Sequence, residues 1–224
     1  MLLVEGHGDV AAVPVLVKRL FTESGSWQSV GLDPHVIRAG EIRKLLSTPR
    51  DRQETEWERF LRVAAQRPGT GGVLLLVDGD ADKVAGQKFC AAIVAQRLSA
   101  LAKNAGGGTR FSVASVFACQ EFESWLIAGI GSVAGKRLPD GRAGVRPGVA
   151  NSDINQGLAK RGAKEWLGER MESGYKETLD QAPLTQIVSL DAIRERNLRS
   201  FRRFENALRQ LVIAISSGSH IVSP

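Results

Sequence analysis

Hydrophobic and polar positions divide the first 130 residues into alternating strand and helix units. Short runs rich in Val and Leu, typical of buried parallel strands, alternate with longer segments in which apolar residues recur every three or four positions. Because proline is tolerated in the first turn of a helix, Pro14 places the start of the first helix near Ala11. The pattern predicts strands at 2–4, 35–39, 73–77 and 111–119, and helices at 11–24, 41–46, 55–66, 83–104 and 120–128. This order is typical of an α/β fold with a mostly parallel sheet of about four strands flanked by helices.

The pattern changes in the C-terminal part of the chain. Residues 129–149 are rich in Gly, Arg and Pro, which predicts a long connection. Helical periodicity resumes at 155–172, 184–188 and 198–216. We therefore expect a core formed by residues 1–130, followed in residues 131–224 by a Gly/Arg-rich connection and a helical extension that packs on the core.

The composition is that of an ordinary globular domain. Of the 224 residues, 43% are hydrophobic and 24% are charged, which is sufficient for a core. No apolar run approaches the length of a membrane span, and the N-terminus lacks the basic region of a signal peptide. Cys90 and Cys119 each lie in an apolar segment, which predicts reduced core thiols in a cytoplasmic protein without a membrane partner.

The formal net charge of +6 indicates an anionic partner, of which nucleic acid is the commonest. A generally basic surface without such a partner is the alternative, and the composition does not separate the two. Basic residues dominate the C-terminal third of the chain. Candidates for contacts with phosphate are Lys160, Lys164, Lys176, Arg199, Arg202 and Arg203, although a solvated helix face is the more frequent explanation for any one of them.

Carboxylates and glycines follow the first and third predicted strands. The first strand ends in EGHGD (5–9) and the third in DGDAD (78–82). Since ligands of open α/β sheets bind beyond the carboxyl ends of the strands, both segments are expected to line one acidic pocket. Its hard oxygen ligands suit Mg²⁺ or Mn²⁺, with positions left for water and phosphate. We predict Glu5, Asp78 and Asp80 as catalytic and metal-binding residues, with Gly6, His7 and Gly79 in the same two turns.

Four further carboxylates near this pocket have more than one interpretation. Asp9 could cap the first helix, and Asp82 could cap a helix that begins at Lys83, or either could serve the site. Glu121 and Glu123 follow the fourth predicted strand and could complete a second metal site.

Together these motifs resemble the toprim domain, which is shared by topoisomerases, bacterial primases, recombination mediators and the overcoming-lysogenization-defect nucleases. The resemblance rests on Glu5-Gly6 after the first strand and on Asp78-Gly79-Asp80 after the third. The segments QEFESWL (120–126), YK (175–176), DQ (180–181) and SFRR (200–203) resemble compact, uncharacterised bacterial toprim-like proteins. The resemblance implies a Rossmann-like sheet and Glu5 as general acid/base or metal ligand. It also implies a possible role as the effector that accompanies an ATPase in bacterial defence against phage.

Three classes of function are compatible with the sequence. The first is a metal-dependent nuclease that hydrolyses DNA or RNA, because the chain lacks the partner domains of a primase or topoisomerase. The second is a small-molecule phosphohydrolase or phosphotransferase with Asp78 as nucleophile, which a trapped aspartyl-phosphate would reveal. The third is a non-catalytic module that binds nucleic acid or a partner protein, and its binding would depend on salt but not on metal.

Overall fold

Five parallel strands form the centre of the computed structural model, which describes residues 1–159 and 161–223. The strands are β1 (Leu2–Val4), β2 (Ile37–Arg38), β3 (Gly72–Asp78), β6 (Ser112–Ala118) and β7 (Val222–Ser223), in the order β2-β1-β3-β6-β7. The predicted α/β fold is confirmed, and all four predicted strands are present. The fifth strand, β7, was not predicted; Val222 and Ser223 form it by pairing with Val113 and Ala114 of β6, a long-range contact that the local sequence does not show.

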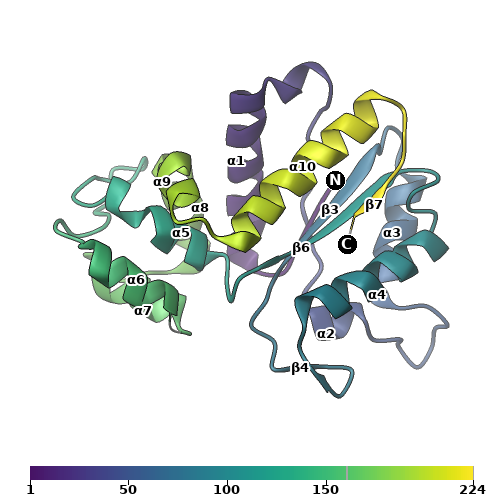
Figure 1. The fold of residues 1–224 in the computed structure, drawn as a ribbon, viewed down its shortest axis with the longest axis horizontal. Helices are drawn as coiled ribbons and strands as arrows, with labels where there is room; N and C mark the ends of the chain where they lie inside the picture. Colours follow the sequence, from purple (N-terminus) through teal and green to yellow (C-terminus); the bar gives the residue numbers. More distant parts are fainter. Residues whose placement is uncertain (160, 224) are drawn as a thin grey trace.

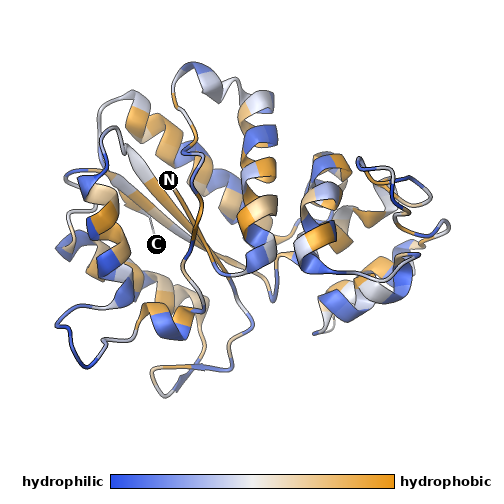
Figure 2. Cartoon of the chain, turned by 180° about the vertical axis from the view of Figure 1, so that it is seen from behind, coloured by the Kyte–Doolittle hydropathy of each residue, from blue (hydrophilic) through white to orange (hydrophobic). Residues whose placement is uncertain are grey.

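Helices cover both faces of this sheet (Figure 1). One face packs against α1 (His7–Ser24) and α10 (Arg199–Ser216), and the other against α2 (Ile42–Leu45), α3 (Glu56–Gln66) and α4 (Ala91–Asn104). Successive strand residues point to opposite faces of the sheet. Leu74 therefore packs on the face covered by α1 and α10, and Leu75 packs on the face covered by α2, α3 and α4. Burial on both faces explains the continuous apolar runs of the strands, which Figure 2 shows in orange between the helices.

Helix α1 begins at His7, four residues before the predicted start at Ala11. Pro14 lies inside the helix, where it cannot donate a backbone hydrogen bond and its ring crowds the carbonyl group one turn earlier. The Asp9 carboxylate accepts a hydrogen bond from the Gly6 N–H at 2.8 Å and thereby satisfies a donor at the helix N-terminus. This cap and the packing of α1 against the C-terminal part of the chain outweigh the local cost of the proline.

The predicted helix at 83–104 is wrong in its first third. Residues 83–88 form a β-hairpin of two strands, β4 (Lys83–Val84) and β5 (Gln87–Lys88), and α4 begins only at Ala91. Ala85 and Gly86 form the two-residue turn with φ of 50° and 80°, a conformation that a helix excludes. Asp82 therefore does not cap a helix beginning at Lys83, and that interpretation is wrong.

A helical lobe lies beside the sheet and is inserted between β6 and α10 (Figure 1). Its helices are α5 (Glu123–Gly129), α6 (Asn151–Ala159), α7 (Ala163–Arg170), α8 (Glu177–Ile187) and α9 (Leu190–Glu195), with a 3₁₀ turn at Ile130–Ser132. A second 3₁₀ turn, at Ser26–Gln28, follows α1. The single helix predicted at 155–172 is two helices, because Gly162 adopts a left-handed conformation with φ of 93°. Trp125 of α5 anchors the lobe to α10, since its Nε1 donates to the Ser200 Oγ at 2.9 Å.

Two properties of the surface bear on the sequence predictions. Cys90 and Cys119 are both exposed free thiols, so the expectation that they are core residues is wrong. They lie at the ends of elements, Cys90 directly before α4 and Cys119 directly after β6, where an apolar segment meets solvent. Among the described residues, no helix has the length and apolar character needed to cross a membrane.

Candidate functional site

Glu5 and Asp78 meet at the switch point of the sheet. β1 and β3 are neighbours, and the chain leaves β1 toward one face and β3 toward the other, which is where open α/β sheets bind ligands. The backbone N–H of Asp78 donates a hydrogen bond to the Glu5 Oε2 at 2.9 Å. The Asp78 Oδ1 in turn accepts from the backbone N–H of Phe122 at 3.0 Å. Two backbone donors therefore fix both carboxylates and leave one oxygen of each toward the cavity.

Gly79 is required by the close approach of β3 and β6 at this edge. A Cβ at position 79 would lie 2.6 Å from the carbonyl oxygen of Ala118, a distance that real side chains do not adopt. The Gly79 N–H donates to the carbonyl oxygen of Gln120 at 2.9 Å, and Gln120 itself has a left-handed φ of 66°. A non-glycine residue in this conformation is uncommon and is more often found at functional sites. The tight junction directs Asp80 and Glu121 toward the same space.

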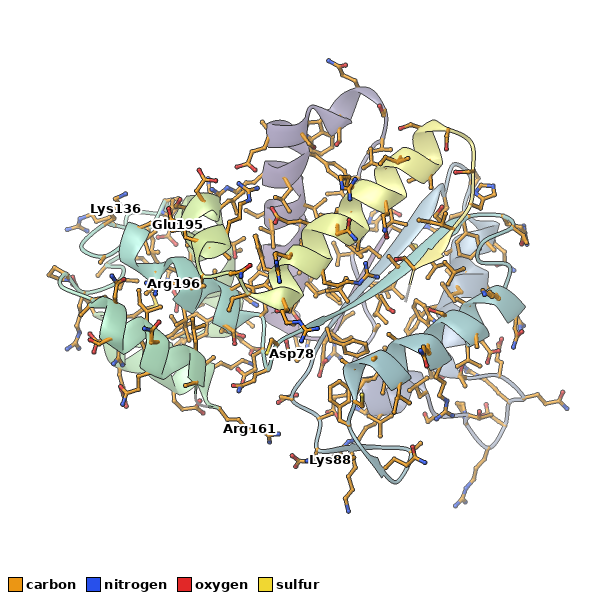
Figure 3. The ribbon with its side chains drawn as sticks, in the orientation of Figure 1. Asp78, Lys88, Lys136, Arg161, Glu195 and Arg196 are labelled. Atoms are coloured by element: carbon orange, nitrogen blue, oxygen red, sulfur yellow. The ribbon has the colours of Figure 1, made fainter. Side chains whose placement is uncertain are left out.

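The carboxylates line a cavity with two lobes, which we call the acidic cavity. The inner lobe, of about 260 Å³, lies against the first turn of α1 and includes Asp9 and Glu123. The outer lobe, of about 460 Å³, opens between β3 and the helical lobe and includes Asp80, Asp82 and Glu121. Four residues line both lobes: Glu5, Glu41, Asp78 and Lys164. Figure 3 shows Asp78 near the middle of the molecule, between the sheet and the helical lobe.

Burial and mutual repulsion raise the pKa values of the central carboxylates. Burial is the largest cause for Asp78, whose pKa lies well above its usual range, and the charges of Asp9, Glu123 and Glu5 raise it further. The pKa of Glu5 is raised to about 7 by burial and by the charges of Asp80 and Asp9, against the lowering effect of its backbone hydrogen bond. Burial also raises the pKa of Glu123 to about 7. Carboxyl groups in this state are poised to bind either protons or a cation.

Asp9 and Gln181 close the inner lobe. Besides capping α1, Asp9 accepts a hydrogen bond from the Gln181 Nε2 at 2.8 Å, so both of its oxygens have partners. The prediction that Asp9 caps the first helix is confirmed. Gly8 lets α8 approach α1, because a Cβ there would lie 1.9 Å from the Gln181 Oε1. Burial raises the pKa of Asp9, and the Gly6 and Gln181 hydrogen bonds oppose that shift.

Lys164 of α7 is the basic residue that the helical lobe places at the junction of the two lobes. Its Nζ lies 2.5 Å from the Glu177 Oε2. Burial alone would lower the pKa of Lys164, but the Glu177 hydrogen bond and the charges of Glu123 and Asp78 raise it, so the side chain stays positively charged. The Tyr175 hydroxyl donates to the Glu123 Oε1 at 2.9 Å and supports the same cluster.

The other predicted basic residues lie elsewhere. Lys176 is exposed and does not line the acidic cavity, and neither do the three arginines of α10, Arg199, Arg202 and Arg203. Arg203 donates to the Ser223 Oγ at 3.0 Å, close to β7. Lys160 lies outside the described residues.

Several lining residues had no place in the sequence prediction. His7 was predicted for the turn after β1, and it is exposed at the inner lobe. Arg38 was not predicted, although it ends β2 and could have been found from the rule that ligands bind beyond the carboxyl ends of strands. Glu41 comes shortly after β2 and could also have been found by this rule, whereas Arg161 and Glu177 follow no strand, and no local signal identifies them. Arg161 pairs with Asp82 at 2.9 Å across the outer lobe.

The donor set fits a divalent cation, although the described residues hold no ready-made ligand cluster. No three His, Cys, Asp or Glu side chains among residues 1–159 and 161–223 converge closely enough to hold a metal ion. The Glu121 Oε2 is nevertheless buried without a hydrogen-bond partner, and burial raises the pKa of this side chain as well. Carboxylates that repel one another, with the Glu121 Oε2 left without a donor, form the kind of oxygen ligand set that Mg²⁺ or Mn²⁺ satisfies. Glu5, Asp78, Asp80 and Glu121 are the residues that would hold it.

Comparison with known proteins gives one match. A family model described as "Domain of unknown function (DUF4276)" matches residues 4–209. No curated protein and no solved structure matches the chain. The matched range contains every residue that lines the acidic cavity, from both the sheet and the helical lobe, and ends before β7.

Proposed function

The chain belongs to the DUF4276 family, and we propose that it is a metal-dependent phosphodiesterase that cleaves DNA or RNA. The observation that carries the proposal is the pair of backbone-anchored carboxylates, Glu5 and Asp78, at the switch point of the sheet. With Asp80 and Glu121 they line one cavity. A protein that concentrates buried carboxylates in this way destabilises itself unless a cation binds there.

The arrangement supports a toprim type of site. Glu5-Gly6 follows β1 and Asp78-Gly79-Asp80 follows β3, and these two strands are neighbours in a parallel sheet. In the order β2-β1-β3-β6-β7, both motif strands lie inside the sheet, with a neighbouring strand on each side. The same two motifs that resemble toprim proteins in the sequence therefore lie side by side in space. The basic net charge of the chain favours a phosphodiester polymer over a small neutral substrate.

Two residues of the cavity, Glu5 and Lys164, have chemical roles in this proposal beside the bound cation. When bound, Mg²⁺ or Mn²⁺ supplies charge neutralisation for the phosphodiester and aligns it for displacement by water. The pKa of Glu5 is raised to about 7 in the metal-free protein, which suits a general acid or base if the other carboxylates, rather than Glu5, hold the cation. Lys164 presents a fixed positive charge at the junction of the lobes, where it can contact a phosphate oxygen.

Lys164→Ala tests the proposal together with the placement of the helical lobe. We expect the wild-type protein to cleave labelled DNA or RNA oligonucleotides in Mg²⁺ or Mn²⁺. The substitution should lower kcat by about a hundredfold, the size expected when one stabilising contact to developing charge is removed. The measurement is steady-state cleavage at fixed metal concentration.

Lys176→Ala is the matched control, since Lys176 is exposed and lies outside the acidic cavity. Its activity should stay within about twofold of wild type, as for most surface substitutions away from a site. Equal losses in the two variants would contradict the role of Lys164. Cleavage that persists in EDTA would contradict the proposed metal dependence.

A further inference from the structure

A β-hairpin projects beside the outer lobe of the acidic cavity. It is formed by β4 and β5, in which Lys83 pairs with Lys88 and Val84 pairs with Gln87 (Figure 1). Asp82, at the base of the hairpin, lines the outer lobe and lies only four residues after Asp78. The chain thus passes directly from the candidate catalytic carboxylates into this hairpin.

Only one face of the hairpin is fixed to the protein. Val84 is buried at 7% exposure, and the Phe89 ring packs edge-on against Phe117 with centroids 5.5 Å apart. The Phe89 N–H closes the hairpin by donating to the carbonyl oxygen of Asp82 at 3.0 Å. Successive strand residues point to opposite faces, so the face opposite Val84 carries Lys83 and points away from the protein.

Two lysines occupy the free face as direct cross-strand partners. Like charges directly opposite each other destabilise a strand pair, and an isolated two-stranded hairpin has little stability of its own. Lys83 and Lys88 are both exposed, and neither makes an ion pair with another described residue. An anion that lies between them would remove the repulsion.

The basic character extends beyond the hairpin. Residues 83–120 contain no Asp or Glu and include five basic residues, Lys83, Lys88, Arg97, Lys103 and Arg110, all of them exposed. On the other side of the outer lobe, Arg161 holds Asp82 in an exposed ion pair. Figure 3 shows Arg161 on the helical lobe and Lys88 on the hairpin, on either side of the region below Asp78. Lys88 and Arg161 therefore place positive charge on both sides of the cavity mouth, whereas Lys103 and Arg110 lie near the start of β6, at the other end of the sheet.

We propose that this hairpin is a nucleic-acid-binding arm, in which Lys83 and Lys88 hold the phosphodiester backbone of the strand that enters the acidic cavity. This proposal rests on the proposed function, which makes the acidic cavity the place where the bound strand is cleaved. An acidic cavity repels a polyanion until a cation is bound, and basic residues beside its mouth offset that repulsion at the point of entry. Contacts with the backbone carry no base information, so the arm confers affinity without sequence preference.

The test is the salt dependence of binding in the absence of metal. Fluorescence anisotropy in EDTA would measure the Kd of labelled single-stranded DNA, single-stranded RNA and duplex DNA at several KCl concentrations. We expect the double variant Lys83→Ala/Lys88→Ala to reduce the slope of log Kd against log salt by about two, one for each phosphate that the variant no longer neutralises. The three nucleic acids distinguish which backbone the arm prefers.

The double variant Lys18→Ala/Lys136→Ala provides the matched control. Both of these lysines are exposed, Lys18 on α1 and Lys136 on the far side of the helical lobe, where Figure 3 labels it. Their removal changes the net charge equally and should leave the slope unchanged. An unchanged slope in the hairpin variant, an equal reduction in both variants, or absence of nucleic-acid binding by the wild type would overturn the proposal.

A second measurement separates the arm from the cleavage chemistry. Hydrolysis of bis(p-nitrophenyl) phosphate in Mn²⁺ needs the acidic cavity but no polymer contacts, so Lys83→Ala/Lys88→Ala should hydrolyse it at the wild-type rate. A wild-type protein that does not hydrolyse this diester, yet shows the expected change in slope, would contradict the proposed function and support the arm. Loss of diester hydrolysis in the hairpin variant would show that the two lysines act within the cavity, and would overturn the arm.

Discussion

Asp78→Asn is expected to lower the rate of metal-dependent cleavage by at least about a thousandfold, equivalent to about 4 kcal/mol of transition-state stabilisation. Asp78 lines both lobes of the acidic cavity, and burial, followed by the charges of Asp9, Glu123 and Glu5, raises its pKa well above the usual range. Asparagine keeps the shape of the side chain and an oxygen that accepts from the Phe122 N–H. It removes the negative charge that a cation requires, so the reduced rate reports on chemistry more than on folding.

The measurement is single-turnover cleavage in Mg²⁺ and Mn²⁺, with thermal unfolding of each variant to show that the fold is retained. Asp51→Asn is the control, because this aspartate is exposed and lies outside the cavity. Full activity in Asp78→Asn would refute the assignment of the site. A trapped phosphoryl group on Asp78 in the wild type would instead support the phosphotransferase alternative.

Glu123→Gln should stabilise the metal-free protein above neutral pH. Glu123 is buried at 1% exposure, and burial is the main reason why its pKa is raised from 4.5 to about 7. Below about pH 4.5 the carboxyl group is protonated in both the folded and the unfolded chain, so its ionisation contributes nothing. As the pH rises from about 4.5 to 7, the unfolded chain releases the proton more readily than the folded protein. The folded state is therefore disfavoured by up to about 3 kcal/mol above pH 7.

Glutamine avoids this penalty and retains an oxygen for the Tyr175 hydroxyl. We expect the free energy of unfolding to rise by about 2–3 kcal/mol at pH 8 and to change little at pH 4.5, as measured by urea denaturation in EDTA. Exposed Glu172→Gln is the control, with no effect expected at either pH. Added Mg²⁺ should stabilise the wild type more than Glu123→Gln if the cation interacts with this charge. A destabilised Glu123→Gln protein at pH 8 would contradict the expectation.

Local sequence patterns predicted most of the sheet and its helices because each depends on a few neighbouring residues. The run Val73–Val77 is apolar at every position since both faces of β3 are covered, and it is readable without knowledge of its partners. The patterns failed where tertiary contacts or turns decide the outcome. The apolar spacing after Lys83 suggested a helix, yet the left-handed turn at Ala85 and Gly86 produces a hairpin. Similarly, Gly162 divides one predicted helix into two.

Of the candidate site, the sequence predicted only the residues that lie directly at or after the ends of strands. Glu5, Asp78 and Asp80 could be grouped because the carboxyl ends of neighbouring parallel strands meet at one edge of the sheet. Lys164 was one of six basic candidates, and nothing in its local sequence distinguished it from Lys176. What distinguishes it is the packing of α7 in the helical lobe, which places Lys164 in the lining of the acidic cavity, paired with Glu177 and within the influence of the charges of Glu123 and Asp78.

The sequence by itself determined the α/β order, the two carboxylate turns and the acidic character of their pocket, because these follow from periodicity and from residue type. Only the tertiary structure decided which distant residues complete that pocket. Gln181 reaches Asp9 across 172 positions of sequence, and the helical lobe brings Lys164 to Asp78. Such contacts depend on how whole elements pack, and no short segment of the chain encodes them.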